Sequence, residues 1–263
     1  MKYILVTGAF GGMGRATVKA LAERGFSVFA LDRKVGKAEE GIIPVEADIT
    51  DEESVAAALL KVKEYTDSLF AIVHYAGVYM LGSMVEMSGE RFESIFRINL
   101  FGAARVNRIF LPLLGNGSRI IMTTSELAPL DPLPFTGIYA VSKSALDKYA
   151  YSLRMELQLL GIGVSVLRAG AVKTKMLGVS TDELDSFCNG TKLYRCNAAN
   201  FKRIVDSVEA KSVAPEKIAA KTVKILGKKD PAFAYSINRN PLLRLLGILP
   251  KRMQFFIIRK ILK

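Results

Sequence analysis

Tryptophan is absent from this chain of 263 residues, histidine occurs once and cysteine twice. The two cysteines, Cys188 and Cys196, have no second pair of cysteine or histidine side chains at ligand spacing, so we expect no metal site. They also form no disulfide framework, which is typical of a reducing compartment. Because the N-terminal apolar run is too short for a secretory signal and leads directly into glycines, we expect a cytoplasmic protein.

Long uncharged apolar stretches are missing as well. No run of about 18 such residues occurs, and therefore no transmembrane helix is expected. Repeats, low-complexity tracts and linkers rich in glycine or serine are also absent. This pattern favours one domain over residues 1–240, followed by a tail at 241–263.

Basic residues, in contrast, are in excess. There are 37 Lys and Arg against 25 Asp and Glu, for a net charge of +12. Such an excess indicates an acidic partner, whether nucleic acid, an anionic membrane or a phosphorylated cofactor. We expect no nucleic-acid partner, because no helix-turn-helix, zinc or RNA-binding motif accompanies the charge and long aliphatic stretches separate the basic residues.

Short β-branched runs alternate with longer helical patterns along most of the chain. The runs are mostly continuous and apolar, as in strands that are covered on both faces, and they fall at 3–7, 27–31, 42–47, 69–74, 119–124, 163–168 and 232–237. Helical patterns fall at 13–24, 51–64, 88–113, 139–160 and 215–227. This α/β alternation predicts right-handed βαβ units in a single Rossmann-type, doubly wound parallel sheet of about seven strands.

A glycine-rich segment, TGAFGGMG at 7–14, joins the first expected strand to the first expected helix. Glycines there allow a tight turn and let backbone N–H groups approach a pyrophosphate, and the flanking strand and helix are the context that such a motif requires. Asp32 ends the second strand, where a carboxylate can accept hydrogen bonds from ribose hydroxyls. Either feature alone also occurs without a ligand, but together they predict a dinucleotide site.

With these motifs the chain resembles the short-chain dehydrogenase/reductase family over residues 2–240. The matches occur in the family's order: the glycine motif at Thr7, Gly8, Gly12 and Gly14, then Asp48, then HYAG (74–77) in place of N-N-A-G, then Asn99, Ser125, the Y-x-x-x-K pair Tyr139 and Lys143, and AGAVKT (169–174) in place of P-G-x-V-x-T. The resemblance implies catalysis by Asn99, Ser125, Tyr139 and Lys143. It also implies a homodimer or homotetramer.

The resemblance further implies which residues hold the ligands. The cofactor would contact Gly8, Phe10, Gly12, Met13, Gly14, Asp32, Arg33, Asp48, Ile49, Ala76, Gly77, Asn99, Tyr139, Lys143, Gly170, Val172 and Thr174. The substrate pocket would include Tyr79, Met80, Glu126, Phe135, Met176 and Leu177, the last two in a substrate loop at 175–212. All of these except Glu126 are apolar or aromatic, which favours a lipophilic alcohol or ketone, as in the hydroxysteroid and retinol dehydrogenase branch, although ordinary core packing must account for some of them.

The chemistry requires a tyrosine that exchanges a proton near neutral pH. Tyr139 and Lys143 stand four residues apart, and thus on one face of a helix. A free tyrosine titrates at about pH 10, and a nearby ammonium group should lower that pKa. Tyr139 is therefore expected to act as the general base in alcohol oxidation and as the general acid in reverse, with Ser125 hydrogen-bonded to the substrate oxygen. By resemblance, Lys143 binds the nicotinamide ribose and Asn99 holds a water in a proton relay.

Three residues depart from the family pattern. His74 and Tyr75 replace two asparagines, and we expect His74 to be a hydrogen-bonded residue at the end of the sheet. Glu126 follows Ser125 directly, where it is either ion-paired at the rim of the site or involved in substrate selection. The residues leave that choice open.

The acidic residue after the second strand favours NAD(H) as the cofactor. The Asp32 carboxylate would repel a 2′-phosphate by roughly 4 kcal/mol at about 4 Å and an effective dielectric near 20. Arg33 can pair with that phosphate, and NADP(H) is therefore the alternative. A catalytically silent NAD(P)-binding sensor or scaffold is the rival function, but such proteins tend to lose the tyrosine or the lysine that this chain keeps.

The tail at 241–263 is basic and apolar, and it contains no acidic residue. Pro250 should divide it into two short helices. One interpretation places these helices in the interface of an anionic membrane, which would make the protein peripheral to that membrane. The other docks them on the protein, where they close the substrate pocket or a subunit interface. The sequence favours neither.

Overall fold

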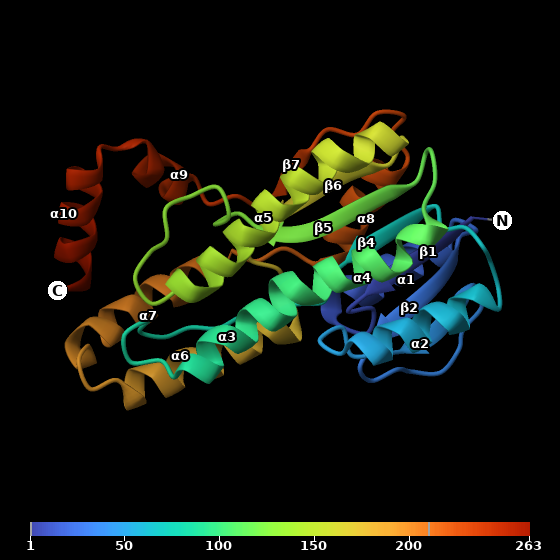
Figure 1. Cartoon of the computed structure of the whole chain (residues 1–263). Coiled ribbons are helices and arrows are strands. Elements are labelled where there is room, and N and C mark those ends of the chain that lie inside the picture. Colours follow the sequence, from blue (N-terminus) through green and yellow to red (C-terminus); the bar gives the residue numbers. More distant parts are fainter. Residues whose placement is uncertain (1, 210) are drawn as a thin grey trace.

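Seven parallel strands form one sheet at the centre of the molecule, in the order β3-β2-β1-β4-β5-β6-β7 (Figure 1). The computed structural model describes the backbone of residues 2–209 and 211–263, and the side chains of these residues except 175–182 and 206–209. The strands are β1 (Tyr3–Thr7), β2 (Ser27–Asp32), β3 (Ile42–Glu46), β4 (Ala71–His74), β5 (Arg119–Ser125), β6 (Gly163–Ala169) and β7 (Ala234–Ile237). The predicted Rossmann-type parallel sheet is confirmed.

Helices cover both faces of this sheet. On one face, α1 (Gly12–Ala22) packs beside α8 (Pro215–Leu226). On the other face lie α2 (Glu52–Lys63), α4 (Ala103–Phe110) and α5 (Gly137–Leu157), the last of which is followed by a 3₁₀ turn. Because both faces are covered, the strands are apolar at nearly every position rather than at alternate ones.

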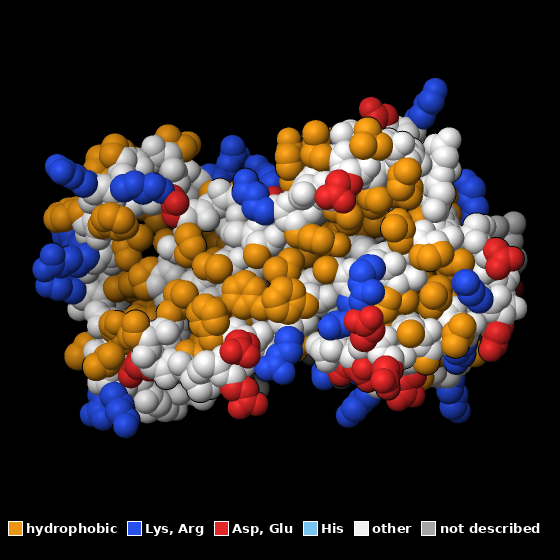
Figure 2. Space-filling view, viewed as in Figure 1, with side chains coloured by type: hydrophobic (Ala, Val, Ile, Leu, Met, Phe, Trp, Pro, Cys, Tyr) orange, Lys and Arg blue, Asp and Glu red, His pale blue; other side chains and the backbone are white. Residues whose placement is uncertain are grey.

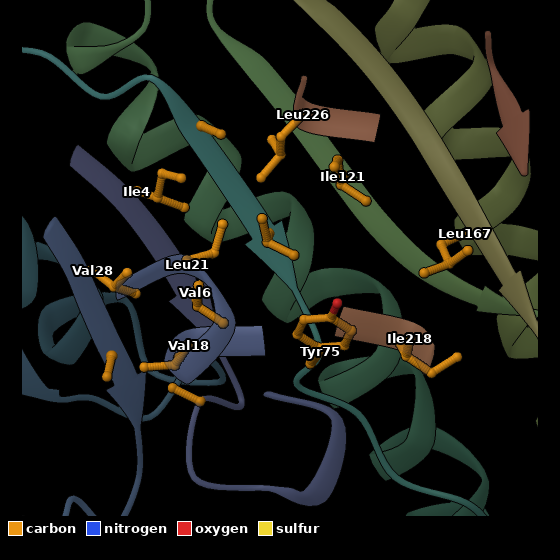
Figure 3. Packing of buried hydrophobic residues seen from close by; sticks show 14 of the residues in the cluster. Ile4, Val6, Val18, Leu21, Val28, Tyr75, Ile121, Leu167, Ile218 and Leu226 are labelled. Atoms are coloured by element: carbon orange, nitrogen blue, oxygen red, sulfur yellow. The ribbon is translucent and has the colours of Figure 1, made fainter. Parts of the chain in front are cut away.

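Alternate residues of β1 show how the two layers of core are divided. Ile4 and Val6 point to the first face and belong to the buried cluster that also includes Val18 of α1 and Ile218 of α8 (Figure 3). Leu5, between them, belongs to the cluster on the opposite face. Each of these side chains is almost wholly buried, which contributes about 1.5–3 kcal/mol per side chain relative to exposure. The core thus anchors the strand whose end carries the glycine-rich turn.

The sheet reverses its winding between β1 and β4, which are neighbours. Their carboxyl ends are level, because Thr7 of β1 is paired with His74 of β4. Chains that leave such neighbouring strands in opposite directions open a crevice at the strand ends. A ligand site is therefore expected at this edge.

The helical pattern at 88–113 is not one regular helix. It consists of α3 (Gly89–Phe96), the π-helical turn η1 (Arg97–Gly102), α4 and the 3₁₀ turn η2 (Leu111–Leu113). Wide turns of this kind occur inside α-helices mostly at functional sites. Here the turn carries Asn99.

The expected substrate loop at 175–212 contains two helices, α6 (Lys175–Gly190) and α7 (Arg195–Glu209). Leu184 of α6 and Phe201 of α7 are buried with Leu81 and Phe135 in a separate apolar cluster beyond the strand ends. The description of this region as a loop is corrected on that point. An amphipathic helix can hold its inner face against such a cluster, whereas an irregular loop would leave buried backbone groups without partners.

The tail forms two helices, α9 (Pro241–Ile248) and α10 (Lys251–Leu262), on either side of Pro250 as expected. The side chain of Asn240 caps α9 by accepting a hydrogen bond from the backbone N–H of Leu242. In Figure 1 the tail lies at the end of the molecule where α7 is found. Within the described residues, no helix combines the length and the apolarity needed to cross a bilayer.

Candidate active site

A cleft of about 610 Å³ lies at the carboxyl ends of β1, β2 and β4. The turn after β1 forms its floor, and Gly8 there has a φ of +65°, a conformation that favours glycine. A Cβ atom on Gly14 would lie 2.0 Å from the carbonyl oxygen of Gly8, and one on Gly12 would lie 2.5 Å from the Thr174 side chain. Only glycine fits at these positions, and the exposed N-terminus of α1 faces the cleft, as pyrophosphate binding requires.

Two aspartates border the same cleft. Asp32 accepts hydrogen bonds from the backbone N–H groups of Phe10, at 3.0 Å, and of Arg33, at 2.8 Å. Burial raises the pKa of Asp48, but hydrogen bonds from Thr50 and the nearby arginines more than offset this, so that the net pKa lies below its usual value. Asp48 can therefore accept hydrogen bonds from a ligand at neutral pH.

Most of the expected cofactor residues meet in this cleft. Its lining includes Gly8, Phe10, Gly12, Met13, Gly14, Asp32, Arg33, Asp48, Ile49, Ala76, Gly77 and Thr174. Gly170 and Val172 line the adjoining cavity instead, together with Tyr139 and Lys143. The glycine cradle, the helix N-terminus and the paired acceptors fit a dinucleotide.

The adjoining cavity has a volume of about 220 Å³ and shares Met13, Tyr75, Gly77, Val78 and Thr174 with the cleft. Ser125 at the end of β5 and Tyr139 and Lys143 of α5 line it at the boundary with the cleft. Lys143 donates from Nζ to the carbonyl oxygen of Thr123, at 3.2 Å, and the ring of Tyr139 lies 4.6 Å from that of Tyr79. Three of the four expected catalytic side chains thus face one space.

The fourth, Asn99, is buried behind the lining. Its amide accepts a hydrogen bond from the N–H of Val78, at 2.8 Å, and donates to the carbonyl oxygen of Val78, at 3.0 Å, and to Ser142 Oγ, at 3.1 Å. Asn99 therefore ties the segment after β4 to α5. A Cβ atom on Gly77 would lie 3.1 Å from Asn99 Oδ1 and 3.3 Å from Lys143 Nζ, which shows how closely the lysine and the asparagine approach this segment.

The expected lowering of the Tyr139 pKa is not found. Burial raises the pKa of Tyr139 to about 12, and a hydrogen bond with Ser125 opposes this only in part. Burial also lowers the pKa of Lys143 to about 8, and Lys143 Nζ lies 5.9 Å from the centre of the Tyr139 ring. Removal of each group from water is the largest cause of its shift, because desolvation disfavours the charged form of both side chains.

The remaining wall of the cavity is apolar and comes from distant parts of the chain. Phe201, Ile204 and Val205 of α7 and Leu243 of α9 contribute to it, although sequence reasoning did not place them there. The three α7 residues follow the i, i+3, i+4 spacing of a helix face, which is the signal that identifies them.

The expected pocket residues are only partly found in the cavity. Tyr79 and Glu126 line it, whereas Met80 and Phe135 are not among the described residues of its lining. Phe135 is instead buried against Phe187, Tyr194 and Phe201, with ring centres 4.7–5.2 Å apart. Phe135 is therefore a core residue, in agreement with the alternative of ordinary core packing. The side chains of Met176 and Leu177 lie outside the described residues.

Glu126 connects the site to the tail. Its Oε2 accepts a hydrogen bond from the backbone N–H of Asn240, at 2.6 Å, just before α9 begins. Burial raises the pKa of Glu126, while that hydrogen bond and the charge of Arg239 act in the opposite direction. The residue therefore holds the base of the tail beside the cavity.

His74 and Tyr75 are buried and hydrogen-bonded. His74 Nε2 lies 2.9 Å from Asn107 Oδ1, and burial lowers the pKa of this histidine to about 4, so the neutral ring is the donor. The expectation of a hydrogen-bonded histidine at the sheet end is confirmed. The Tyr75 hydroxyl accepts from Thr17 of α1, at 2.9 Å, and lies 2.6 Å from Thr222 of α8, so it bridges two helices, a role that the sequence did not indicate.

Neither cysteine is part of a disulfide. Cys188 lies on α6, where its Sγ donates to the carbonyl oxygen of Ala198 at 3.4 Å, and Cys196 is exposed on α7. Over the described residues, no three His, Cys, Asp or Glu side chains are grouped as a metal site would require.

The fold and the paired spaces are those of a dinucleotide-binding oxidoreductase, and comparison with known proteins identifies the family. The family model described as short chain dehydrogenase matches residues 2–185. Estradiol 17-beta-dehydrogenase 2 of Mus musculus is 34% identical over 191 residues, which are 67% of this chain and 50% of that protein. The chain belongs to the short-chain dehydrogenase family, whose members are NAD(P)-dependent oxidoreductases.

Two further similarities extend over nearly the whole chain. A 3-ketodihydrosphingosine reductase of Bacteroides thetaiotaomicron is 25% identical over 271 residues, covering 97% of this chain and 96% of that protein. The crystal structure of a short chain dehydrogenase/reductase from Burkholderia phymatum in complex with NAD superposes with a TM-score of 0.77 at 23% identity, covering 93% of this chain and 91% of that one. The chain spans half the length of the estradiol dehydrogenase but matches the other two end to end.

Proposed function

We propose that this protein transfers a hydride between NAD(H) and a secondary alcohol or ketone that is lipophilic, such as a hydroxysteroid or a retinoid. The observation that carries the proposal is the position of Ser125, Tyr139 and Lys143, which line an apolar cavity where it meets the dinucleotide cleft. The nicotinamide supplies the hydride chemistry when it is bound, and the protein supplies position and proton transfer.

Each of the three side chains has a distinct role at the substrate oxygen. The Tyr139 hydroxyl gives a proton to this oxygen in ketone reduction and takes it back in alcohol oxidation. A raised pKa keeps Tyr139 protonated, which suits the donor role, and positive charge at Lys143 favours the phenolate in the reverse direction. Ser125 hydrogen-bonds the same oxygen and thereby orients the carbon that exchanges the hydride.

The rival function, a catalytically silent sensor or scaffold, would need no such arrangement. All four residues of the expected set are present, and Asn99 makes three hydrogen bonds that position the segment lining both spaces. An enzyme accounts for these features, whereas a sensor would require only the cleft. We therefore favour catalysis.

The choice of NAD(H) rests on Asp32, whose carboxylate lines the cleft and is held in place by the backbone of Phe10 and Arg33. A 2′-phosphate beside it would meet a like charge. The expected result is a kcat/KM at least about tenfold higher with NAD(H) than with NADP(H). A preference for NADP(H), with the exposed Arg33 as the phosphate partner, would reverse the assignment.

A lipophilic substrate is supported by the apolar wall of the cavity. Val172, Phe201, Val205 and Leu243 line the cavity together with the polar side chains of Ser125 and Tyr139. A few polar groups in an otherwise apolar pocket are typical of sites for lipophilic ligands. The two relatives named above are named for estradiol and 3-ketodihydrosphingosine, both lipophilic molecules.

Association into a homodimer or homotetramer is part of the same proposal. Phe101 of η1 and Tyr151 and Met155 of α5 are apolar side chains that are each about half exposed, on two neighbouring helical elements. A second subunit would remove them from water. The division into a catalytic domain at 1–240 and a tail at 241–263 likewise belongs to the proposal.

The substitution Tyr139→Phe tests the function directly. It removes the titrating hydroxyl and should lower kcat at least about a hundredfold on any identified substrate, while NADH binding stays within about twofold of the wild type. Hydroxysteroids, retinoids and aliphatic alcohols are the substrates to screen by cofactor absorbance. Wild-type turnover by Tyr139→Phe would contradict the mechanism, and turnover of sugars alone would contradict the substrate class.

A further inference from the structure

The two tail helices have an inner face that is fixed to the protein. Leu262 of α10 is buried in the apolar cluster of α6 and α7, and its carbonyl oxygen accepts hydrogen bonds from the side-chain amides of Asn197, at 2.7 Å, and Asn200, at 3.4 Å. Leu243 of α9 lines the substrate cavity, and Glu126 holds the backbone of Asn240. The docked arrangement is therefore present, and it uses only one side of each helix.

The outer face of the same helices is apolar and uncovered. On α9, the side chains of Leu242, Leu245 and Ile248 are 69%, 61% and 80% exposed, and their spacing of three residues places them along one stripe. On α10, Phe255 and Phe256 are 67% and 66% exposed. Large exposed apolar side chains concentrated on two consecutive helices mark an interaction site rather than ordinary solvent-facing surface.

Positive charge surrounds this apolar face. Residues 240–263 include no acidic residue. They include six basic ones, which are Arg244, Lys251, Arg252, Arg259, Lys260 and Lys263. Among the described residues, one ion pair involves this segment, that between Lys251 and Asp131. Figure 2 shows Lys and Arg side chains beside hydrophobic ones at the end of the molecule where α10 lies in Figure 1.

We propose that the outer face of α9 and α10 docks on an anionic lipid bilayer. Apolar side chains in a helix plane beside a cluster of cations are what such an interface binds, with the rings among the acyl chains and the cations at the headgroups. A second copy of the chain would cover the apolar stripe equally well. It would, however, bring two clusters of cations together without an acidic partner, and like charges across an interface oppose association.

Docking in this way places the bilayer next to the substrate cavity. Leu243 lies on the inner face of the helix whose outer face carries Leu242 and Leu245, so a single short helix would separate the lipid from the cavity. A lipophilic substrate that partitions into the membrane would then enter from that side. This consequence rests on the proposed function, whereas the docking itself does not.

Co-sedimentation of the full chain with vesicles tests the docking without cofactor or substrate. The vesicles are phosphatidylcholine alone or with about a third phosphatidylserine. We expect binding to the anionic vesicles that weakens as salt is raised, because salt screens the headgroup charge. The double variant Phe255→Ser/Phe256→Ser should bind at least about tenfold more weakly. The matched control is Leu60→Ser on α2, which removes an apolar side chain of equal exposure (67%) outside the tail and should bind like the wild type.

A second variant removes charge instead of apolar surface. Arg252→Gln/Arg259→Gln/Lys260→Gln changes three exposed side chains and should also lose binding at least about tenfold, with most of the salt dependence. The melting temperature of each variant is the control, and a value equal to that of the wild type shows that the fold is kept. The proposal is overturned if the wild type stays in the supernatant or if it binds neutral and anionic vesicles equally. It is also overturned if the wild type is a dimer that binds no vesicles and the Phe255→Ser/Phe256→Ser variant is a monomer, because the face would then be a subunit interface.

Discussion

The dinucleotide cleft and the substrate cavity share a boundary, but they are built in different ways. The cleft is lined mainly by short segments that directly follow β1, β2, β3 and β4, together with Ile98, Thr174 and Glu216 from later in the chain. Its shape depends on glycines and backbone groups. The cavity is lined mostly by side chains, and these come from as far apart in the sequence as Tyr79 and Leu243. A site made of backbone tolerates few sequences, whereas a wall made of side chains can be altered one residue at a time.

The largest expected effect comes from a substitution in the cleft that leaves the cavity unchanged. In Gly14→Ala, the new Cβ would lie 2.0 Å from the Gly8 carbonyl oxygen, so the turn must shift and cofactor affinity should fall by at least about a hundredfold. Gly89→Ala on α3 is the control, because a Cβ there meets nothing within 4 Å. Titration of NADH fluorescence measures both. Equal affinities for the two variants would show that the glycine turn does not form the binding surface.

Acid should destabilise the folded protein through His74, which is buried at the end of β4 beside the cleft. The folded protein holds the pKa of this residue at about 4, below its ordinary 6.5, so the unfolded chain binds the proton first as the pH falls. The free energy of unfolding should therefore drop by about 3 kcal/mol between pH 6.5 and 4 through this group alone. His74→Asn removes the contribution, and histidine occurs nowhere else in the chain. Parallel pH profiles of denaturant unfolding for the two proteins would contradict the assignment.

The smallest expected effect concerns the cavity. Leu243→Ala removes one apolar side chain from the wall and should raise the KM for a lipophilic substrate about three- to tenfold, with cofactor affinity unchanged. Leu245→Ala, two residues further along the same helix and 61% exposed, is the matched control and should leave KM as it is. Steady-state kinetics compares the two. If both raise KM alike, the tail influences the site through its docking and not through Leu243.

The sequence by itself determined most of the fold and the glycine turn and aspartates of the cleft. The apolar runs predicted all seven strands to within about two residues, because strands buried on both faces leave that signal. Glycines and strand-end aspartates predicted the cleft, since the groups that form it lie close together in the chain, and local geometry restricts which residues can stand there. The resemblance to the family, carried by these motifs and by Tyr139 and Lys143, is confirmed by the family match.

Only the tertiary structure decided what depends on packing between distant segments. It showed that burial keeps the pKa of Tyr139 near 12, that Phe135 belongs to the core, and that α7 and α9 close the cavity. It also gave Glu126 a partner more than a hundred residues away, at Asn240. The physical reason is that desolvation and side-chain contact depend on neighbours in space, which no local pattern of residue types specifies. For the tail, the sequence left two interpretations open. The structure shows one face of each helix docked on the protein, and membrane contact by the other face is the proposal made above.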